Sequence, residues 1–211
     1  MKIVAISDTH WYYGLYDDLP PGDILIIAGD YTSHGSLMDL ITFLSRITIL
    51  KQKGHYRHVI ITPGNHNLYE EENPDKVPGF MEKAGVIYLV DDLCTIDGLT
   101  FYGTPWSPMF NNWAFMAEED ELVQKFKKIP KNIDVLITHS PPFGTLDLIN
   151  GRHLGSKALE QRVLFTRPKI HIFGHLHDAH GIVHSKHTDF YNVSMLNDGY
   201  QAVFKPTIIE L

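Results

Sequence analysis

Five short apolar runs, nearly continuous in Val and Ile, recur along the chain at residues 2–7, 23–29, 58–62, 134–138 and 169–174. Strands that are buried on both faces have this uninterrupted pattern, because neither side of the strand meets water. The pattern therefore predicts a set of interior strands in a largely parallel sheet.

Helices are expected between these runs. Ser36 can cap a helix over about residues 37–52, and Ser156 can cap one over about 157–166. Residues 118–129 open with an acidic cluster, which favours a helix N-terminus through the helix dipole. Alternation of strands and helices is typical of an α/β protein.

Further strands are expected at residues 85–90, and at 94–98 and 99–103, which an Asp97-Gly98 hairpin turn would join. Segments 189–196 and 201–211 resemble antiparallel strands. No repeat or low-complexity linker divides the chain, so we expect one domain over residues 1–211, an α/β sandwich with a mixed sheet.

Residues 104–117 are rich in Trp, Pro and Asn and fit neither helical nor strand periodicity. Two interpretations are open: a loop beside a functional site, or a loop that covers one end of the core.

Composition and charge narrow the classes of function. No stretch approaches the roughly 18 to 20 apolar residues of a membrane span, and Met1 leads directly into a strand-like run. We therefore expect a cytoplasmic protein without a signal peptide or a membrane partner. A net charge of −7 with 18 Lys and Arg argues against extended nucleic acid as a partner, because that binding depends on phosphate neutralisation. Small substrates are expected, and the oligomeric state is left open.

Histidine is the most unusual component, with 13 residues, several of them beside Asp or Gly. Imidazole is the commonest metal ligand in proteins. Cys94 is the only cysteine, so neither a disulfide nor a thiolate cluster is expected. Any metal would have to be held by nitrogen and oxygen ligands.

Polar side chains follow the carboxyl end of every predicted interior strand. Ligands of α/β sheets bind in the crevice outside these strand ends, so the side chains are expected to meet there. They are Asp8, His10, Asp30, Asn65, His66, His139, His175 and His177. A mixed set of carboxylates, amide and imidazoles suits two divalent transition ions among Mn²⁺, Fe²⁺, Co²⁺, Ni²⁺ and Zn²⁺. Two such ions can clamp a phosphoryl group.

Each of these residues alone also has an ordinary explanation. Asp8, Asp30 and Asn65 are common turn formers, and His139 could be a hydrogen-bonded loop residue. Their joint occurrence at successive strand ends favours a metal site over coincidence.

The motifs SDTH, AGD, PGNH, THSPP and FGHLH occur in this order and resemble the motif series of the calcineurin-like metallophosphoesterase superfamily. GTPWSPMFNNWAF, RPKIHIFGHLHDAHG and YNVSMLN are similar to its small single-domain phosphodiesterase branch, so the resemblance covers almost the whole chain. It implies a four-layer α/β/β/α sandwich with mixed sheets and a dinuclear metal site at the carboxyl ends of the strands.

The resemblance also implies residue roles. One metal would be held by Asp8, His10, Asp30 and His177, and the other by Asp30, Asn65, His139 and His175. Asp30 would bridge the two ions, among which manganese is favoured. His66 takes the family's position for the group that donates a proton or hydrogen bond to the departing oxygen.

Two positions depart from related patterns. Asn67 stands where the family more often has Asp or Glu, which bears on the protonation state of His66. Ser33 stands where purple acid phosphatases place an iron-binding Tyr, although Tyr31 lies nearby, so that branch is rejected.

Other polar residues carry weaker signals. The acidic run at 69–73 is interpreted as a solvated turn rather than a third metal site. His153 and His180 lie in loops that follow site strands, so they are the other histidines expected near the site. Arg152 and Arg167 could reach a phosphate, but their positions do not favour that over the surface.

The leading hypothesis is a phosphodiesterase that hydrolyses cyclic nucleotides or similar small diesters, through attack by a metal-bridging hydroxide. The same site could serve phosphomonoesters, nucleotides or nucleic-acid ends. A metal-binding interaction module that has lost turnover is the contrasting class. All seven ligand positions hold competent residues, which favours the enzyme.

Overall fold

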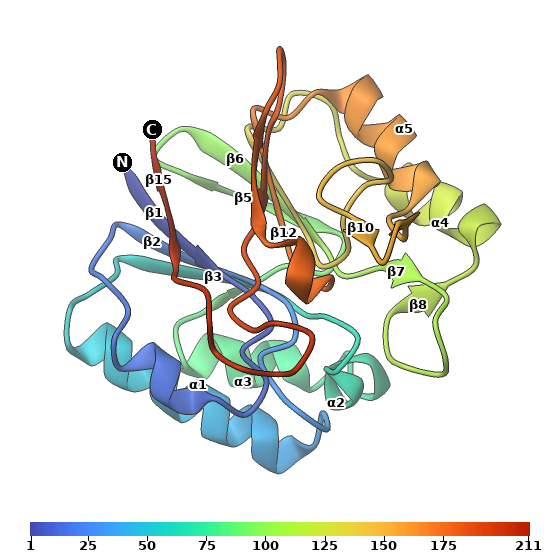
Figure 1. Cartoon of the computed structure of the whole chain (residues 1–211). Coiled ribbons are helices and arrows are strands. Elements are labelled where there is room, and N and C mark those ends of the chain that lie inside the picture. The colour runs from blue at the N-terminus through green and yellow to red at the C-terminus, as the bar shows by residue number, and fades with distance from the viewer.

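Two mixed β-sheets lie face to face at the centre of the computed structural model, which describes residues 1–211. Helices cover the outer face of each sheet, so the layers follow the order α/β/β/α (Figure 1). This confirms the predicted fold class.

The first sheet has the strand order β15-β1-β2-β3-β4. Its strands are β1 (Lys2–Ile6), β2 (Ile24–Ala28), β3 (His58–Thr62), β4 (Ile87–Tyr88) and β15 (Thr207–Glu210). β1 to β4 are parallel, and β15 pairs antiparallel with β1, which places the two chain ends together (Figure 1). Every residue of β2 is buried, as its continuous apolar run predicted.

The second sheet has the strand order β13-β14-β12-β9-β6-β5. Its strands are β5 (Asp92–Ile96), β6 (Leu99–Thr104), β9 (Val135–Thr138), β12 (Ile170–Phe173), β13 (Gly181–His184) and β14 (Asp189–Asn192). The predicted hairpin between β5 and β6 is confirmed. Asp97 and Gly98 have φ of 50° and 85°, the left-handed pair that a tight hairpin turn requires.

Each of the two C-terminal segments contributes a strand with an antiparallel partner, as expected. β14 runs parallel to β12, because β13 has already reversed the chain and pairs antiparallel with β14. β15 does pair antiparallel, but with β1 of the other sheet. The C-terminal segments thus close both sheets.

The helices are α1 (Leu37–Gln52), α2 (Leu68–Glu72), α3 (Val77–Lys83), α4 (Glu119–Phe126) and α5 (Lys157–Thr166), with short 3₁₀ turns η1 (Tyr13–Tyr16) and η2 (His177–Ala179). The hydroxyls of Ser36 and Ser156 accept the backbone N–H of Asp39 and Leu159, each at 3.1 Å. Both predicted caps are therefore confirmed. The interval between α1 and β4 holds α2 and α3, which the sequence pattern did not predict.

The acidic run at 69–73 is helical rather than a turn, and it is only partly solvated: Glu71 and Glu72 are exposed, whereas Glu70 is buried. It lies largely within α2, and Glu70 is 2% exposed because the helix turns it inward. Burial raises the pKa of Glu70 to about 7. The Asn67 side-chain amide donates to Glu70 Oε1 at 3.2 Å, while Oε2 has no hydrogen-bond partner.

Three apolar clusters fill the spaces between the layers. The central cluster joins Ile26 and Ile60 of the first sheet to Phe101 and Ile172 of the second. The outer clusters pack α1 against the first sheet, and α4 with α5 against the second. The strand ends are left to form the site. None of the helices has the length and apolar character needed to cross a membrane.

Residues 104–117 close a loop through the strands β7 (Ser107–Pro108) and β8 (Met116–Ala117), which pair with each other. Met109, Phe110 and Trp113 of this loop line a cavity. The interpretation of the segment as a loop beside a site is therefore favoured. A small antiparallel hairpin, formed by β10 (Leu148–Ile149) and β11 (Arg152–His153), lies before α5.

Candidate metal centre and substrate cavity

The chain bends sharply where the strands end. Asp8, His10, Asp30 and His175 have φ of 53°, 46°, 51° and 70°. This left-handed region is sparsely used by residues other than Gly, although Asp and His tolerate it better than most. The bends follow β1, β2 and β12, and they bring side chains from separate strands into one cluster.

One group of potential ligands is Asp8, His10 and His177, whose ligand atoms all lie within 4.8 Å of one another. His177 Nε2 is 3.5 Å from Asp8 Oδ1 and 3.5 Å from His10 Nε2. The other ring nitrogen of His177, Nδ1, donates to the Asn197 carbonyl at 3.1 Å. Such a bond fixes the ring and leaves Nε2 to face a metal.

A second group, Asp8, Asp30 and His139, meets the same 4.8 Å limit. His139 Nδ1 donates to the Ala28 carbonyl at 2.9 Å, and its Nε2 lies 3.3 Å from Asp30 Oδ2. The same Nε2 is 2.9 Å from Asn65 Oδ1. These contacts bring three of the sequence-predicted ligands to one point.

The remaining members adjoin these groups. The ring centroid of His175 is 5.0 Å from that of His139, and its backbone N–H donates to Asp8 Oδ2 at 3.0 Å. A third group, His10, Asp30 and His66, overlaps the first two. All eight residues predicted from the sequence are thus brought together.

Glycines of the AGD and PGNH motifs make this approach possible. A Cβ atom on Gly29 would overlap the His139 ring, and one on Gly64 would overlap both that ring and the Asp30 carboxylate. Gly29 also has a φ of 99°, which L side chains rarely adopt. Any larger residue at these positions would displace the candidate ligands.

Burial and charge oppose each other inside the cluster. Burial alone would lower the pKa of His139 and of His177, but the nearby Asp30 and Asp8 raise each pKa to about 9. Burial would raise the pKa of Asp8, but its hydrogen bond to His177 holds that pKa below its usual range. The carboxylates thus favour the protonated form of both imidazoles.

The donor set fits two divalent transition ions. His139 Nε2 faces a carboxylate oxygen and an amide oxygen, which repel its lone pair unless a proton or cation lies among them. His10 Nδ1 is buried without a hydrogen-bond partner. Imidazole, carboxylate and amide together suit borderline ions, and the lack of a thiolate among the donors disfavours Cu(I) or iron–sulfur chemistry.

His66 lies between this cluster and the cavity. Its Nδ1 donates to the Ser33 carbonyl at 2.7 Å, so Nε2 is the ring nitrogen left for a ligand. Its backbone N–H donates to Asp30 Oδ1 at 2.8 Å. The Trp113 indole stacks on the imidazole, with 4.4 Å between ring centroids and 29° between the ring planes.

The Asn67 side chain makes its hydrogen bonds to groups other than the His66 ring. Its Oδ1 accepts the backbone N–H groups of Gly64 at 2.7 Å and Asp30 at 3.1 Å, and its Nδ2 donates to Thr32 Oγ1 at 2.8 Å. Asn67 therefore links, through hydrogen bonds, the loop after β2 to the loop after β3, and both loops carry candidate ligands. The group that holds the imidazole is the Ser33 carbonyl, which the sequence could not indicate.

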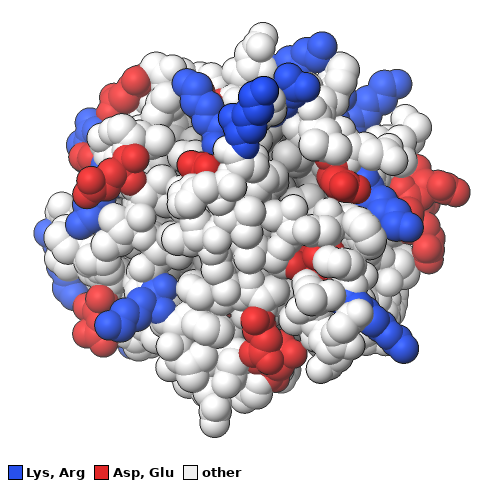
Figure 2. All heavy atoms as spheres, turned by 45° about the horizontal axis from the view of Figure 1, so that its top comes forward, with Lys and Arg blue, Asp and Glu red and all other residues white.

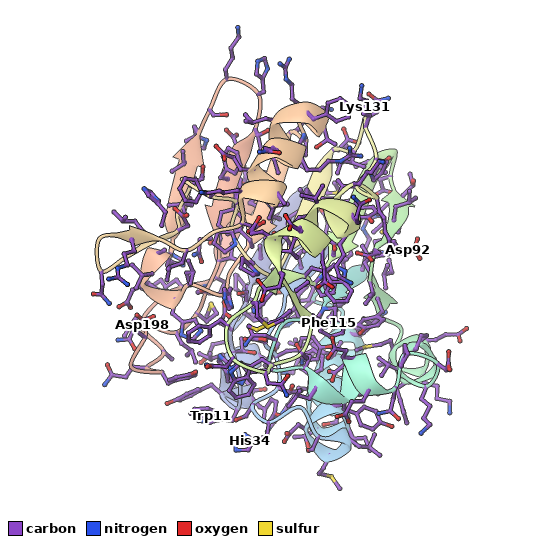
Figure 3. The ribbon with its side chains drawn as sticks, turned by 90° about the vertical axis from the view of Figure 1, so that its right-hand side faces the viewer. Trp11, His34, Asp92, Phe115, Lys131 and Asp198 are labelled. Atoms are coloured by element: carbon purple, nitrogen blue, oxygen red, sulfur yellow. The ribbon has the colours of Figure 1, made fainter.

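A cavity of about 770 Å³ opens beside the cluster and is reached by Asp30, Asn65, His66, His175 and His177. The 104–117 loop supplies one part of its lining, and Phe143, His153, Leu154 and Lys157 supply another. Figure 3 looks onto this side of the molecule, with Phe115 of the loop near the middle and Asp198, a further lining residue, to the left.

His153 enters the cavity lining with a buried partner. Its Nδ1 donates to Asp147 Oδ1 at 2.6 Å, and Asp147 is 1% exposed. Asp147 Oδ2 accepts the backbone N–H groups of Gly144 and Gly155, each at 3.0 Å. The arrangement holds the ring with Nε2 available to the cavity. The sequence pointed to His153 but gave no signal for Asp147.

The other residues singled out from the sequence lie outside the cavity. His180 Nδ1 donates to the Ser194 carbonyl at 2.9 Å, and its ring stacks on Phe204 at 4.3 Å. This is a structural role. Arg152 and Arg167 do not line the cavity, which Lys157 alone among Lys and Arg reaches.

Two stacked sheets with carboxylates and imidazoles gathered at the strand ends form a candidate metal centre. The chain belongs to the calcineurin-like phosphoesterase family, whose model matches residues 1–179. The family consists of metal-dependent phosphoester hydrolases, so the resemblance seen in the motifs is confirmed.

Similarity to curated proteins along the whole of this chain supports the assignment. The chain is 33% identical to UPF0046 protein T07D4.2 of Caenorhabditis elegans, over 100% of this chain and 60% of that protein. It is 34% identical to UPF0046 protein K07C11.7 of the same species, over 99% and 74%. Human metallophosphoesterase domain-containing protein 1 is 31% identical, over 100% and 71%. The chain spans about three fifths of the first of these relatives.

Solved structures share the fold. The crystal structure of TT1561 of Thermus thermophilus superposes with a TM-score of 0.60 at 13% identity, over 90% of this chain and 88% of that one. Another crystal structure gives a TM-score of 0.67 at 16% identity, over 90% and 89%. At these identities the likeness establishes the fold alone.

Proposed function

We propose that this protein is a dinuclear metal phosphodiesterase that hydrolyses small phosphodiesters, such as cyclic nucleotides. The observation that carries the proposal is that three overlapping groups of potential ligands lie at the wall of a large cavity that also has aromatic side chains in its lining. Membership of the family supports phosphoester hydrolysis, and the cavity favours diesters.

The proposal assigns the ligands in two sets that share Asp30. One set is Asp8, His10, Asp30 and His177, and the other is Asp30, Asn65, His139 and His175. Asp30 suits the shared position because its carboxylate has two oxygens and because it, unlike Asp8, also lines the cavity. Manganese is the favoured ion among those that a nitrogen and oxygen donor set accepts.

Two bound ions would supply an activated water and stabilise charge on the phosphoryl oxygens. The chain's own part is to orient the groups around the phosphate. The carbonyls of Ala28 and Asn197 fix the rings of His139 and His177. His66 Nε2 donates a proton or hydrogen bond to the departing oxygen as its bond to phosphorus breaks.

The cavity lining supports a diester rather than a monoester substrate. Met109, Phe110, Trp113 and Phe143 offer apolar surface to the second organic group that a diester carries. A monoester bears more negative charge and no such group, yet Lys157 is the one Lys or Arg in the lining. The cavity thus offers apolar contact where a monoester would need further cations.

Extended nucleic acid is disfavoured by the charge distribution. Acidic side chains outnumber basic ones by 25 to 18 in the chain. On the face in Figure 2, basic and acidic residues are interspersed around a largely uncharged centre. A broad run of Lys and Arg, which phosphate backbones require, is not seen on that face.

The test is hydrolysis of bis(p-nitrophenyl) phosphate beside p-nitrophenyl phosphate, with chelated protein to which Mn²⁺ is restored. We expect turnover of the diester that depends on Mn²⁺ and is lost in Asp30→Asn and reduced in His66→Ala. Faster turnover of the monoester would reverse the substrate preference. Absence of turnover despite two bound metals would instead support a non-catalytic metal-binding module.

A further inference from the structure

The Trp113 indole contacts the His66 imidazole and comes from a different part of the chain. Their ring centroids are 4.4 Å apart and their planes differ by 29°, which is a stacked arrangement. Trp113 is 36% exposed, so burial of the indole in a core does not explain its position. Aromatic pairs at this separation attract each other beyond the area that they bury.

The loop that carries Trp113 is fastened directly to the site. The Ala114 backbone N–H donates to the Asn65 carbonyl at 3.1 Å, and the Phe115 N–H donates to Glu71 Oε1 at 2.8 Å. Asn65 is a proposed metal ligand, and Glu71 lies in α2, which begins directly after Asn67. These bonds fasten the loop to the PGNH motif and to α2, next to Trp113, which lies over His66.

The imidazole is thereby held from three directions. The edge of the His10 ring meets it at a centroid distance of 4.6 Å and an angle of 89°. The Ser33 carbonyl accepts from Nδ1 at 2.7 Å, which limits rotation of the ring. The indole covers a ring face, and without it one side of the imidazole would be open to the cavity.

We infer that Trp113 is a positioning residue for leaving-group protonation: it holds the His66 imidazole so that Nε2 meets the departing oxygen. The inference rests on the proposed phosphodiesterase function. Small displacements of a catalytic group cost large factors in rate, so removal of the Trp113 indole should slow hydrolysis. The cost should grow with the basicity of the leaving group, since a basic oxygen depends more on proton donation.

The experiment compares two diesters of similar shape, bis(p-nitrophenyl) phosphate and diphenyl phosphate, whose phenolate is the more basic leaving group. The Mn²⁺-loaded variants are Trp113→Ala, Trp113→Phe, His66→Ala and the double variant Trp113→Ala/His66→Ala. For Trp113→Ala we expect kcat to fall about tenfold or more on diphenyl phosphate, and less than about threefold on the nitrophenyl ester. Trp113→Phe should restore most of the rate, because a phenyl ring can stack in the same place.

The double variant separates positioning from simple substrate binding. If Trp113 acts through His66, the double variant has the same rate as His66→Ala alone. Phe110→Ala is the matched control, since it removes an aromatic side chain of the same loop that makes no stack with His66. It should alter KM by similar factors for both esters. Metal content measured on each protein checks that the ligand cluster is intact.

Other outcomes are distinguishable. A loss in Trp113→Ala that is equal for both esters, or that multiplies with the loss in His66→Ala, overturns the inference and leaves Trp113 as a substrate contact. An unchanged rate in His66→Ala, with activity still dependent on Asp30, removes the role of His66 and overturns the inference while the phosphodiesterase stands. Absence of all diester turnover rejects the proposed function and this inference together.

Discussion

His139 Nε2 lies 3.3 Å from Asp30 Oδ2, and both side chains are buried. The other ring nitrogen of His139, Nδ1, donates to the Ala28 carbonyl. Nε2 is therefore left to face Asp30 and the side-chain oxygen of Asn65. Two strands that are not consecutive in the chain, β2 and β9, therefore deliver an oriented nitrogen and a carboxylate to one point.

Metal binding at this point should stabilise the fold. A ligand that binds the folded state alone raises the unfolding free energy by about 2.7 kcal/mol at 100 times its dissociation constant. We expect chelation to lower the melting temperature and Mn²⁺ to restore it. Asp30→Asn should abolish the response, whereas Asp92→Asn, on the edge strand β5, should keep it. Thermal denaturation with and without Mn²⁺ is the measurement, and an equal response of Asp30→Asn would contradict the assignment.

Asn67 should be essential to the geometry of the site although it touches no substrate. Asn67→Ala would leave the buried N–H groups of Gly64 and Asp30 without their acceptor. Each of the two unsatisfied buried groups costs about 1 to 3 kcal/mol, so we expect a loss of about 2 to 6 kcal/mol in unfolding free energy. Urea denaturation measures it. The exposed Lys76, changed to Ala, is the control, and equal stability of the two variants would refute the bridging role of Asn67.

Glu70 should make stability depend on pH. Its folded-state pKa is raised by burial to about 7, whereas an unfolded Glu titrates at about 4.3. The stabilising effect of the protonated form is thus complete below about pH 4.3 and is lost as pH rises through about 7. The loss is on the order of 4 kcal/mol.

Glu70→Gln removes the titrating group and keeps the shape, so it should be more stable than the parent chain at pH 8 and similar at pH 4. Melting temperatures at the two pH values test this. Glu72→Gln, an exposed position in the same helix, should show no such crossover. A parallel shift of Glu70→Gln at both pH values would show that the carboxyl is not protonated in the fold.

His153 should act on substrate binding rather than on turnover. Asp147 holds its ring with Nε2 available to the cavity, where it can hydrogen-bond a diester substituent. Loss of one such bond, worth about 1 kcal/mol, raises KM about fivefold in His153→Ala with kcat little changed. Steady-state kinetics on bis(p-nitrophenyl) phosphate measure it. Arg152→Ala, the neighbouring position outside the cavity lining, should leave KM unaltered, and a fall in kcat alone for His153→Ala would assign it to chemistry.

The interior strands, the capped helices and the residues at the strand ends could all be predicted from the sequence. This was possible because those features are local: continuous apolar runs mark buried strands, Ser36 and Ser156 mark helix starts, and strand ends in α/β sheets share one edge. The motif series added the order in which Asp8, Asp30, Asn65, His139 and His175 follow their strands.

The tertiary structure alone decided what surrounds those residues. Trp113 on His66, Asp147 on His153, and the inward turn of Glu70 join groups whose contact depends on loop paths, and no periodicity encodes a loop path. The same limit explains why the burial of Glu70 and the parallel pairing of β14 with β12 were not predicted. Composition describes a segment, but burial and pairing depend on what packs against it.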